Sequence, residues 1–251
     1  MLVGAQFFTI REYCKDLDGL AESLKKVADI GYTTVQLSGI CEYDPAWMKE
    51  QLDKNGLKCV LTHMPPDKLS GEPELLVKNH DILDCEYIGL GSHKVKDEDG
   101  MRYDDFFTKY LETAKYFKEH GKYFMYHNHA HEFRKLDGKL ILDKLAEDMP
   151  KELMGFTLDT YWVQVGGGDP AQWIEKLSGR VPVIHLKDFS YDTEPMMAVV
   201  GEGNINFDRV FEKAEAAGTK YMMVEQDKCY GEDPFECLRR SYNNLKAFGF
   251  R

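Results

Sequence analysis

The sequence has no C-x-x-C cysteine pair, no run of basic residues and no long apolar segment. Its six cysteines are scattered, which argues against a disulfide framework or a zinc ribbon and is typical of reduced thiols. The first residues lack the basic start and apolar run of a secretory signal peptide. No stretch approaches the roughly 18 apolar residues that cross a bilayer. We therefore expect a cytoplasmic protein with no membrane partner.

Basic charge is also scarce, with 32 lysine and arginine residues against 43 aspartate and glutamate residues and a formal net charge of −11. Proteins that bind nucleic acids concentrate lysine and arginine into a footprint that neutralises phosphates. We therefore expect no nucleic-acid partner. Hydrophobic residues make up 43% of the 251 residues, enough for a sizeable core. Because no proline- or glycine-rich linker interrupts the chain, residues 1–251 are predicted to form a single domain.

Short apolar runs alternate along the chain with longer amphipathic segments. The runs are rich in β-branched and aromatic residues and largely apolar on both faces, as buried parallel strands are. Eight runs are predicted strands: residues 3–8, 33–38, 58–63, 87–91, 123–129, 155–160, 181–188 and 221–227. The intervening segments have a helical period. In the first of them Leu17, Leu20 and Leu24 lie three and four residues apart, and Gly31 fits a helix end.

Eight strands alternating with about eight helices predict an α/β fold, a single (β/α)8 TIM barrel. The strands would pair in parallel through right-handed crossovers. A doubly wound open sheet is the alternative. It is disfavoured because no G-x-G-x-x-G or G-x-x-x-x-G-K-[ST] element follows an early strand.

Polar residues of the types that do chemistry follow the predicted strands, at the end where (β/α)8 barrels place their active sites. Asp159, His185 and Glu225, together with a glutamate or histidine from the fifth strand, have the makeup of a divalent metal site. Carboxylate oxygens with one imidazole favour Mn2+ or Mg2+, with Co2+ and Zn2+ as further options. Because burying several carboxylates together without a cation is costly, the set predicts one bound divalent metal ion.

Several of these segments resemble the xylose isomerase-like TIM barrels, the sugar phosphate isomerase/epimerase superfamily that also contains inosose dehydratase and endonuclease IV. The resemblance runs over essentially the whole chain. It rests on YHNHAHEF (Tyr126 to Phe133), LDTYW (Leu158 to Trp162), HLKD (His185 to Asp188), GEGNINF (Gly201 to Phe207) and VEQD (Val224 to Asp227). In that superfamily Glu, Asp, His and Glu from strands five to eight typically hold the metal. The resemblance assigns the last three of these ligands to Asp159, His185 and Glu225.

The first ligand departs from the family pattern, which has a glutamate inside the fifth strand, close to where this chain has His127. We take Glu132, at the end of the HNHAHEF segment, as the fourth ligand. His127 or His129 could replace it or join it. A mechanism that requires two facing glutamates therefore does not follow for this chain.

The resemblance implies a metal-dependent sugar or sugar phosphate isomerase or epimerase that removes an α-proton and forms a metal-stabilised enediolate. The base would be Glu225, or otherwise His127 or His129, and Lys187 could neutralise an oxyanion or phosphate. The predicted partner is thus a small sugar. For contact with it we single out His63 and Gln36 at strand ends, Trp162 for stacking, Asp188 beside Lys187, and Glu202 on a glycine-flanked loop.

Other functions stay open at this point. A lyase or dehydratase of an inosose or keto-sugar would use the same site, with an imidazole protonating the departing hydroxyl. An endonuclease IV-like phosphodiesterase would need more histidine ligands and a basic groove, which the net charge of −11 disfavours. A non-catalytic sugar-binding barrel is disfavoured by the intact set of Asp159, His185 and Glu225. Members of the family are often dimers or tetramers, so the resemblance leaves a homo-oligomer open.

Overall fold

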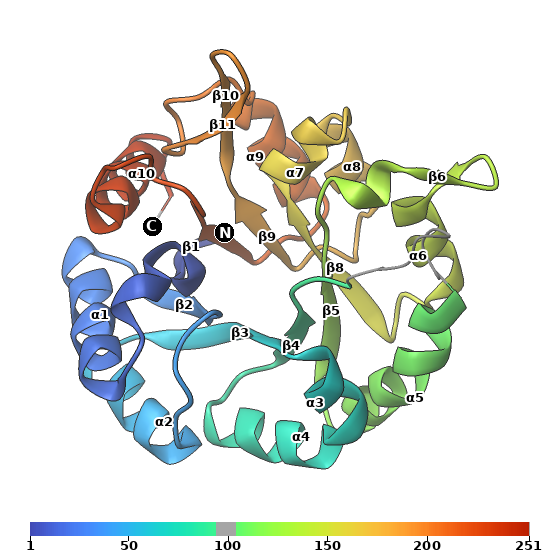
Figure 1. Ribbon diagram of the computed structural model, residues 1–251, viewed down its shortest axis with the longest axis horizontal. Coiled ribbons are helices and arrows are strands. Elements are labelled where there is room, and N and C mark those ends of the chain that lie inside the picture. Colours follow the sequence, from blue (N-terminus) through green and yellow to red (C-terminus); the bar gives the residue numbers. More distant parts are fainter. Residues whose placement is uncertain (94–103, 251) are drawn as a thin grey trace.

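The computed structural model, which describes residues 1–93 and 104–250, contains a closed barrel of eight parallel strands (Figure 1). In barrel order these are β1 (Leu2–Gln6), β12 (Tyr221–Val224), β9 (Val183–Leu186), β8 (Met154–Asp159), β5 (Tyr123–His127), β4 (Tyr87–Leu90), β3 (Lys58–Met64) and β2 (Thr34–Leu37). Each strand overlaps one of the predicted runs, and the (β/α)8 barrel is confirmed.

Helices surround the barrel; they lie between consecutive barrel strands along the chain, except for the last helix, which follows the last strand (Figure 1). They are α1 (Leu17–Ile30), α2 (Pro45–Lys54), α3 (Pro66–Gly71), α4 (Pro73–Ile82), α5 (Asp104–Glu119), α6 (Ile141–Asp148), α7 (Thr160–Val165), α8 (Pro170–Lys176), α9 (Phe207–Ala216) and α10 (Pro234–Ala247). Local signals set their ends. The Asp16 side chain accepts the Gly19 N–H at the start of α1, and Gly31 ends that helix with a φ of 124°.

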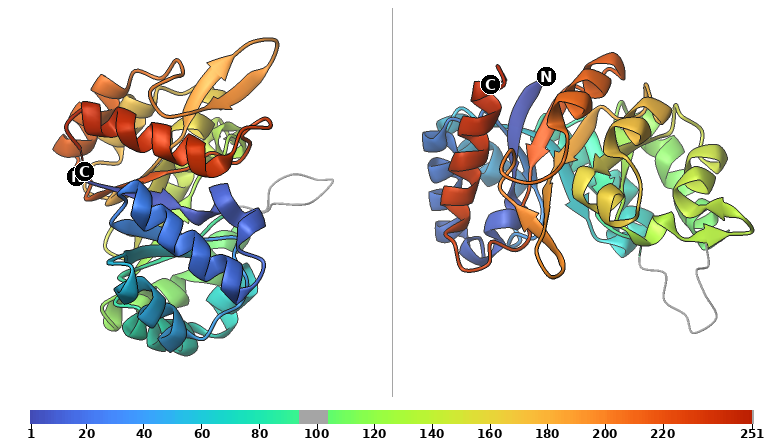
Figure 2. Two further views of the ribbon diagram at one scale, coloured as in Figure 1. Left: turned by 90° about the vertical axis from the view of Figure 1, so that its left-hand side faces the viewer. Right: turned by 90° about the horizontal axis from the view of Figure 1, so that it is seen from above.

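Four short elements extend beyond the barrel and were not predicted. Two are 3-10 helices, η1 (Phe7–Tyr13) and η2 (His131–Phe133), and two are antiparallel hairpins, β6 (Lys135–Leu136) with β7 (Lys139–Leu140) and β10 (Asp188–Tyr191) with β11 (Pro195–Ala198). The β10–β11 hairpin projects from the barrel end opposite the chain termini (Figure 2). Such strands are too short to show a hydrophobic period. Across the described ranges no helix has the length and apolarity of a membrane span.

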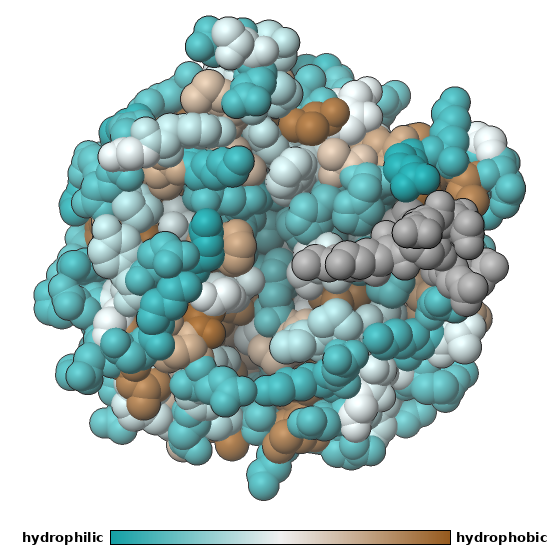
Figure 3. Space-filling view, in the orientation of Figure 1, coloured by the Kyte–Doolittle hydropathy of each residue, from teal (hydrophilic) through white to brown (hydrophobic). Residues whose placement is uncertain are grey.

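The two-residue period of the strands separates an apolar layer from a polar one inside the barrel. Met125, Val183 and Met223 belong to a small buried cluster that is distinct from the main core. Two residues further along the same strands come His127, His185 and Glu225, whose side chains therefore point to the same face. Figure 3, which looks onto this end of the barrel, shows a central hollow with hydrophilic residues in and around it.

Candidate active site

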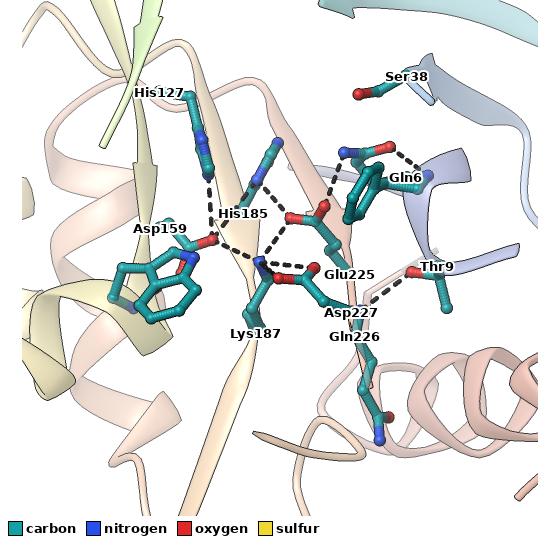
Figure 4. A network of polar contacts seen from close by, with 12 residues as sticks. Gln6, Thr9, Ser38, His127, Asp159, His185, Lys187, Glu225, Gln226 and Asp227 are labelled. Atoms are coloured by element: carbon teal, nitrogen blue, oxygen red, sulfur yellow. Dashed lines mark hydrogen bonds and ion pairs between the residues drawn. The ribbon is translucent and has the colours of Figure 1, made fainter. Parts of the chain in front are cut away.

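The carboxyl ends of four neighbouring strands bring together the side chains His127, Asp159, His185 and Glu225 (Figure 4). Each is buried, and each offers one ligand atom within 4.8 Å of all the others. His127 ends β5, Asp159 ends β8, His185 lies in β9, and Glu225 follows β12. Because all four strands run in parallel, their carboxyl ends converge on one edge of the barrel.

Outer hydrogen bonds determine which imidazole nitrogens face the centre of this group. His127 Nδ1 lies 2.8 Å from the carbonyl oxygen of Gly91, which can only accept, so Nδ1 carries the proton and Nε2 presents a lone pair. His185 Nε2 likewise donates to Gln36 Oε1 at 2.7 Å, while Gln36 Nε2 donates to His63 Nε2 at 2.9 Å. The His185 atom that faces the group is therefore Nδ1.

Both inward-facing imidazole nitrogens meet carboxylate oxygens. Burial opposes a charge on His185, but Glu225 and Asp159 outweigh it and raise the pKa of His185, so the carboxylates favour positive charge between them. His127 Nε2 lies 3.2 Å from Asp159 Oδ2, and His185 Nδ1 lies 2.9 Å from Glu225 Oε2. His185 Nδ1 and Glu225 Oε2 are both buried, and Glu225 Oε2 also forms an ion pair with Lys187. Two imidazoles and two carboxylates are a donor set suited to a divalent transition metal ion, so the residues fit the predicted cofactor.

Lys187 lies inside the same group, and only 1% of its side chain is exposed. Its Nζ is 3.0 Å from Asp159 Oδ2, 2.9 Å from Glu225 Oε2 and 3.0 Å from Asp227 Oδ1. Burial opposes the charged form, but the three carboxylates outweigh it and raise the pKa of Lys187. Burial also opposes charge on Asp159 and Glu225, yet Lys187 holds the pKa of both well below the usual range. The carboxylates thus favour the charged form of the lysine, which is not the form that acts as an amine nucleophile.

Three further groups position the carboxylates. Gln6 Nε2 donates to Glu225 Oε1 at 2.8 Å, which leaves Oε2 to face the centre. Asp159 Oδ1 accepts the N–H of Trp162 as the N-cap of α7, and the Asp159 N–H donates to Asn128 Oδ1. Sequence reasoning missed Gln6 because the first strand was extended to Phe8. The structure ends this strand at Gln6, its first polar residue, and that rule would have placed Gln6 at the site.

Glu132 lies outside the group of four, and its carboxylate organises the loop after β5. It accepts hydrogen bonds from the Tyr126 hydroxyl at 2.6 Å and the His129 N–H at 2.8 Å, and it forms a second cluster with His129 and His131. The alternation of β5 turns His127 inward, whereas Glu132 lies in η2, five residues beyond the strand's last residue. The geometry therefore favours His127 as the fifth-strand ligand.

Burial raises the pKa of Glu132 to about 7, although the two hydrogen bonds oppose that shift. A carboxyl with a raised pKa binds its proton more tightly in the folded protein, so its contribution to stability is present at low pH and is lost as pH rises from about 4.5 to about 7. We expect Glu132→Gln to flatten this fall in the free energy of unfolding by about 2–3 kcal/mol, measured by urea titration at several pH values. The exposed Glu152→Gln should not change the slope. An unchanged slope in Glu132→Gln would contradict this assignment.

The residues predicted to contact substrate divide into two sets. His63 and Gln36 line the group, with the His63 ring 5.3 Å from that of His127, and the Trp162 ring lies 5.7 Å from Lys187 Nζ. Asp188 and Glu202 do not reach the site. The alternation that turns Lys187 inward turns Asp188 outward onto backbone N–H groups, and Glu202 pairs with Arg240 at the surface.

Comparisons with known proteins agree with the barrel fold described above. The family model "Xylose isomerase-like TIM barrel" matches residues 24–241, and no curated protein matches significantly. A sugar phosphate isomerase/epimerase from Parabacteroides distasonis ATCC 8503 is 23% identical with a TM-score of 0.82, covering 98% of this chain and 93% of that chain. An L-ribulose 3-epimerase is 16% identical with a TM-score of 0.74, covering 98% and 94%.

A probable 3-DHS dehydratase involved in petrobactin synthesis, from Bacillus anthracis, is 14% identical with a TM-score of 0.72, and the match covers 100% of both chains. At such identities these likenesses show the fold. The family model, which spans most of the sequence, shows more: the chain belongs to the xylose isomerase-like TIM-barrel family.

Proposed function

We propose that this protein removes a proton from the carbon next to the carbonyl of a sugar or similar polyhydroxylated ketone and returns it elsewhere, as an isomerase or epimerase. The observation that carries the proposal is that two imidazole nitrogens and two carboxylates face one another in the buried group His127, Asp159, His185 and Glu225. These four residues would hold one divalent metal ion. Such an ion supplies Lewis acidity, which polarises a carbonyl and makes the neighbouring C–H more acidic.

The surrounding residues can move a proton and stabilise charge. Of the three proposed bases, His127 directs Nε2 and Glu225 directs Oε2 at the group's centre. His129 Nδ1 is buried without a hydrogen-bond partner, and its ring lies 4.8 Å from that of His127. Burial and the neighbouring His127 lower the pKa of His129 to about 3, which keeps the imidazole neutral but makes it a weak proton acceptor. Lys187 supplies fixed positive charge for an oxygen that gains negative charge during proton removal.

A cavity of about 500 Å3 adjoins the group at His63 and could take the part of the substrate that does not react. Its lining is mainly apolar and includes Ile40, Met64 and Leu75. The proposed substrates therefore include polyhydroxylated ketones that carry an apolar portion.

Elimination of a β-hydroxyl is a second candidate outcome at the same site, and Asp227 favours it. Burial and the neighbouring Glu225 raise the pKa of Asp227 to about 6, although Lys187 opposes the shift. A carboxyl with such a pKa can carry a proton near neutral pH and deliver it to a departing hydroxyl. Loss of water from the substrate would identify this outcome.

The proposal is tested by incubating the protein in D2O with Mn2+ and a panel of ketoses and inososes. We expect deuterium to appear at the carbon next to the carbonyl of at least one compound, detected by NMR and mass spectrometry. His129→Gln identifies the base: a slowing of at least about 100-fold assigns that role to His129, and unchanged exchange leaves it to Glu225 or His127. The exposed His120→Gln is the matched control. No exchange into any compound of the panel would contradict the proposal.

A further inference from the structure

We propose that Lys187 is an internal counterion that competes with the divalent metal ion for the same carboxylates. The ammonium would hold the site together when metal is absent and would move aside when metal binds. This inference rests on the metal site of the proposed function. It adds that Lys187 lowers the affinity of the site for metal, which the four ligands alone do not imply.

The competition follows from shared atoms. Lys187 Nζ contacts Asp159 Oδ2 at 3.0 Å and Glu225 Oε2 at 2.9 Å. The same two oxygens face His127 Nε2 and His185 Nδ1, as Figure 4 shows. An ion bound by the four side chains would therefore share both carboxylate oxygens with an ammonium. Like charges repel strongly when they are buried and share their ligands, so both cations cannot bind these oxygens well at the same time.

Asp227 offers the ammonium a second place. Its two carboxylate oxygens lie 3.0 Å and 3.1 Å from Lys187 Nζ, and 20% of its side chain is exposed. Asp227 also lines a separate cavity of about 310 Å3 together with Thr9 and Arg11, so there is open space on its side of the site. Because a lysine side chain has several rotatable bonds, Nζ can keep its contact with Asp227 while leaving the other two carboxylates.

Charge balance supports this exchange of partners. The described site contains three carboxylates, Asp159, Glu225 and Asp227, around one ammonium. With metal bound, a dication would balance Asp159 and Glu225, and Lys187 would balance Asp227. Without a dication, the single ammonium would have to balance all three carboxylates. Buried ionised groups are retained only when they are paired in this way.

The test compares Lys187→Met with Lys122→Met in metal binding, which requires no substrate. Lys122 is a matched control because it is also a buried lysine with a carboxylate partner, Asp81, but it lies at the opposite end of β5. Mn2+ and Zn2+ affinities are measured by chelator competition on the full chain. We expect Lys187→Met to bind metal at least about 10-fold more tightly than the unchanged protein, because a competing buried charge is removed. Lys122→Met should bind as the unchanged protein does.

Thermal melting gives a second readout. In excess EDTA, Lys187→Met should melt at a lower temperature than the unchanged protein, because Asp159, Glu225 and Asp227 lose the ammonium that contacts all three. Added Mn2+ should then raise its melting temperature by more than it raises that of the unchanged protein. If Lys187→Met does not fold in EDTA, the same measurements on Lys187→Gln, which keeps a hydrogen-bond donor but no charge, decide the matter.

The outcomes separate this inference from the proposed function. Equal metal affinity in Lys187→Met, Lys187→Gln and the unchanged protein would overturn the competition and leave the metal site standing. Binding by the two variants alone would support the competition and contradict metal dependence of the unchanged protein. No metal binding by any of the three proteins would overturn both.

Discussion

Replacing Asp159 with alanine is expected to lower bound metal from about one ion per chain to below about 0.1 and to slow α-proton exchange at least about 1,000-fold. Asp159 Oδ2 is the atom where the group's contacts converge: it lies 3.2 Å from His127 Nε2, 3.7 Å from His185 Nδ1 and 3.0 Å from Lys187 Nζ. Its removal also leaves the Lys187 ammonium with one carboxylate fewer. Elemental analysis of the purified protein and deuterium exchange measure the two effects.

A capping control is needed because Asp159 also begins a helix. Its Oδ1 accepts the Trp162 N–H at the start of α7, so alanine removes a cap as well as a ligand. Asp169 caps α8 in the same way, through the Gln172 N–H, but does not belong to the group of four. Asp169→Ala should lose stability and keep its metal. Full metal content in Asp159→Ala would refute the ligand assignment.

The sequence was most informative where strand periodicity alone decides side-chain direction. Asp159, His185 and Glu225 were selected because they end apolar strands, and parallel strands of a barrel bring such ends together. The same rule would have selected His127, the last residue of β5. Glu132 was chosen instead from a family pattern, and it falls in η2, where no strand period applies. That His127, Asp159, His185 and Glu225 bind a metal stays a prediction. The structure does show that their four side chains lie close together.

Other features depended on contacts that a one-dimensional pattern does not show. The proton positions on His127 and His185 follow from Gly91 and Gln36, which are 36 and 149 residues away. Lys187 was interpreted as a possible charge for the substrate, yet its contacts to three carboxylates depend on how β8, β9 and β12 pack. The barrel could therefore be predicted from periodicity, and the electrostatics of its centre could not.

Asp188→Ala is expected to destabilise the fold by about 2–3 kcal/mol, although Asp188 does not belong to the group of four. Its buried carboxylate accepts four backbone N–H groups, those of Phe189, Gly201, Gly203 and Ile205, at 2.7–3.2 Å. Alanine would leave these donors without their acceptor. Ile205 is buried, Phe189 and Gly203 are half-buried and Gly201 is exposed, so water can replace part of the lost hydrogen bonding but not all of it. Urea or thermal unfolding monitored by circular dichroism measures the loss.

The close approach of this loop gives an independent reason to expect the effect. A Cβ at Gly203 would lie 2.5 Å from Asp188 Oδ1, so the glycine is what allows the backbone to reach the carboxylate. Glu202, on the same loop, pairs with Arg240 at the surface, and Glu202→Ala is the matched control. A surface ion pair contributes only about 0–1 kcal/mol, so the control should unfold almost as the unchanged protein does. If Asp188→Ala proved as stable as Glu202→Ala, the carboxylate would not be what holds the loop, and its assignment to substrate binding would have to be reconsidered.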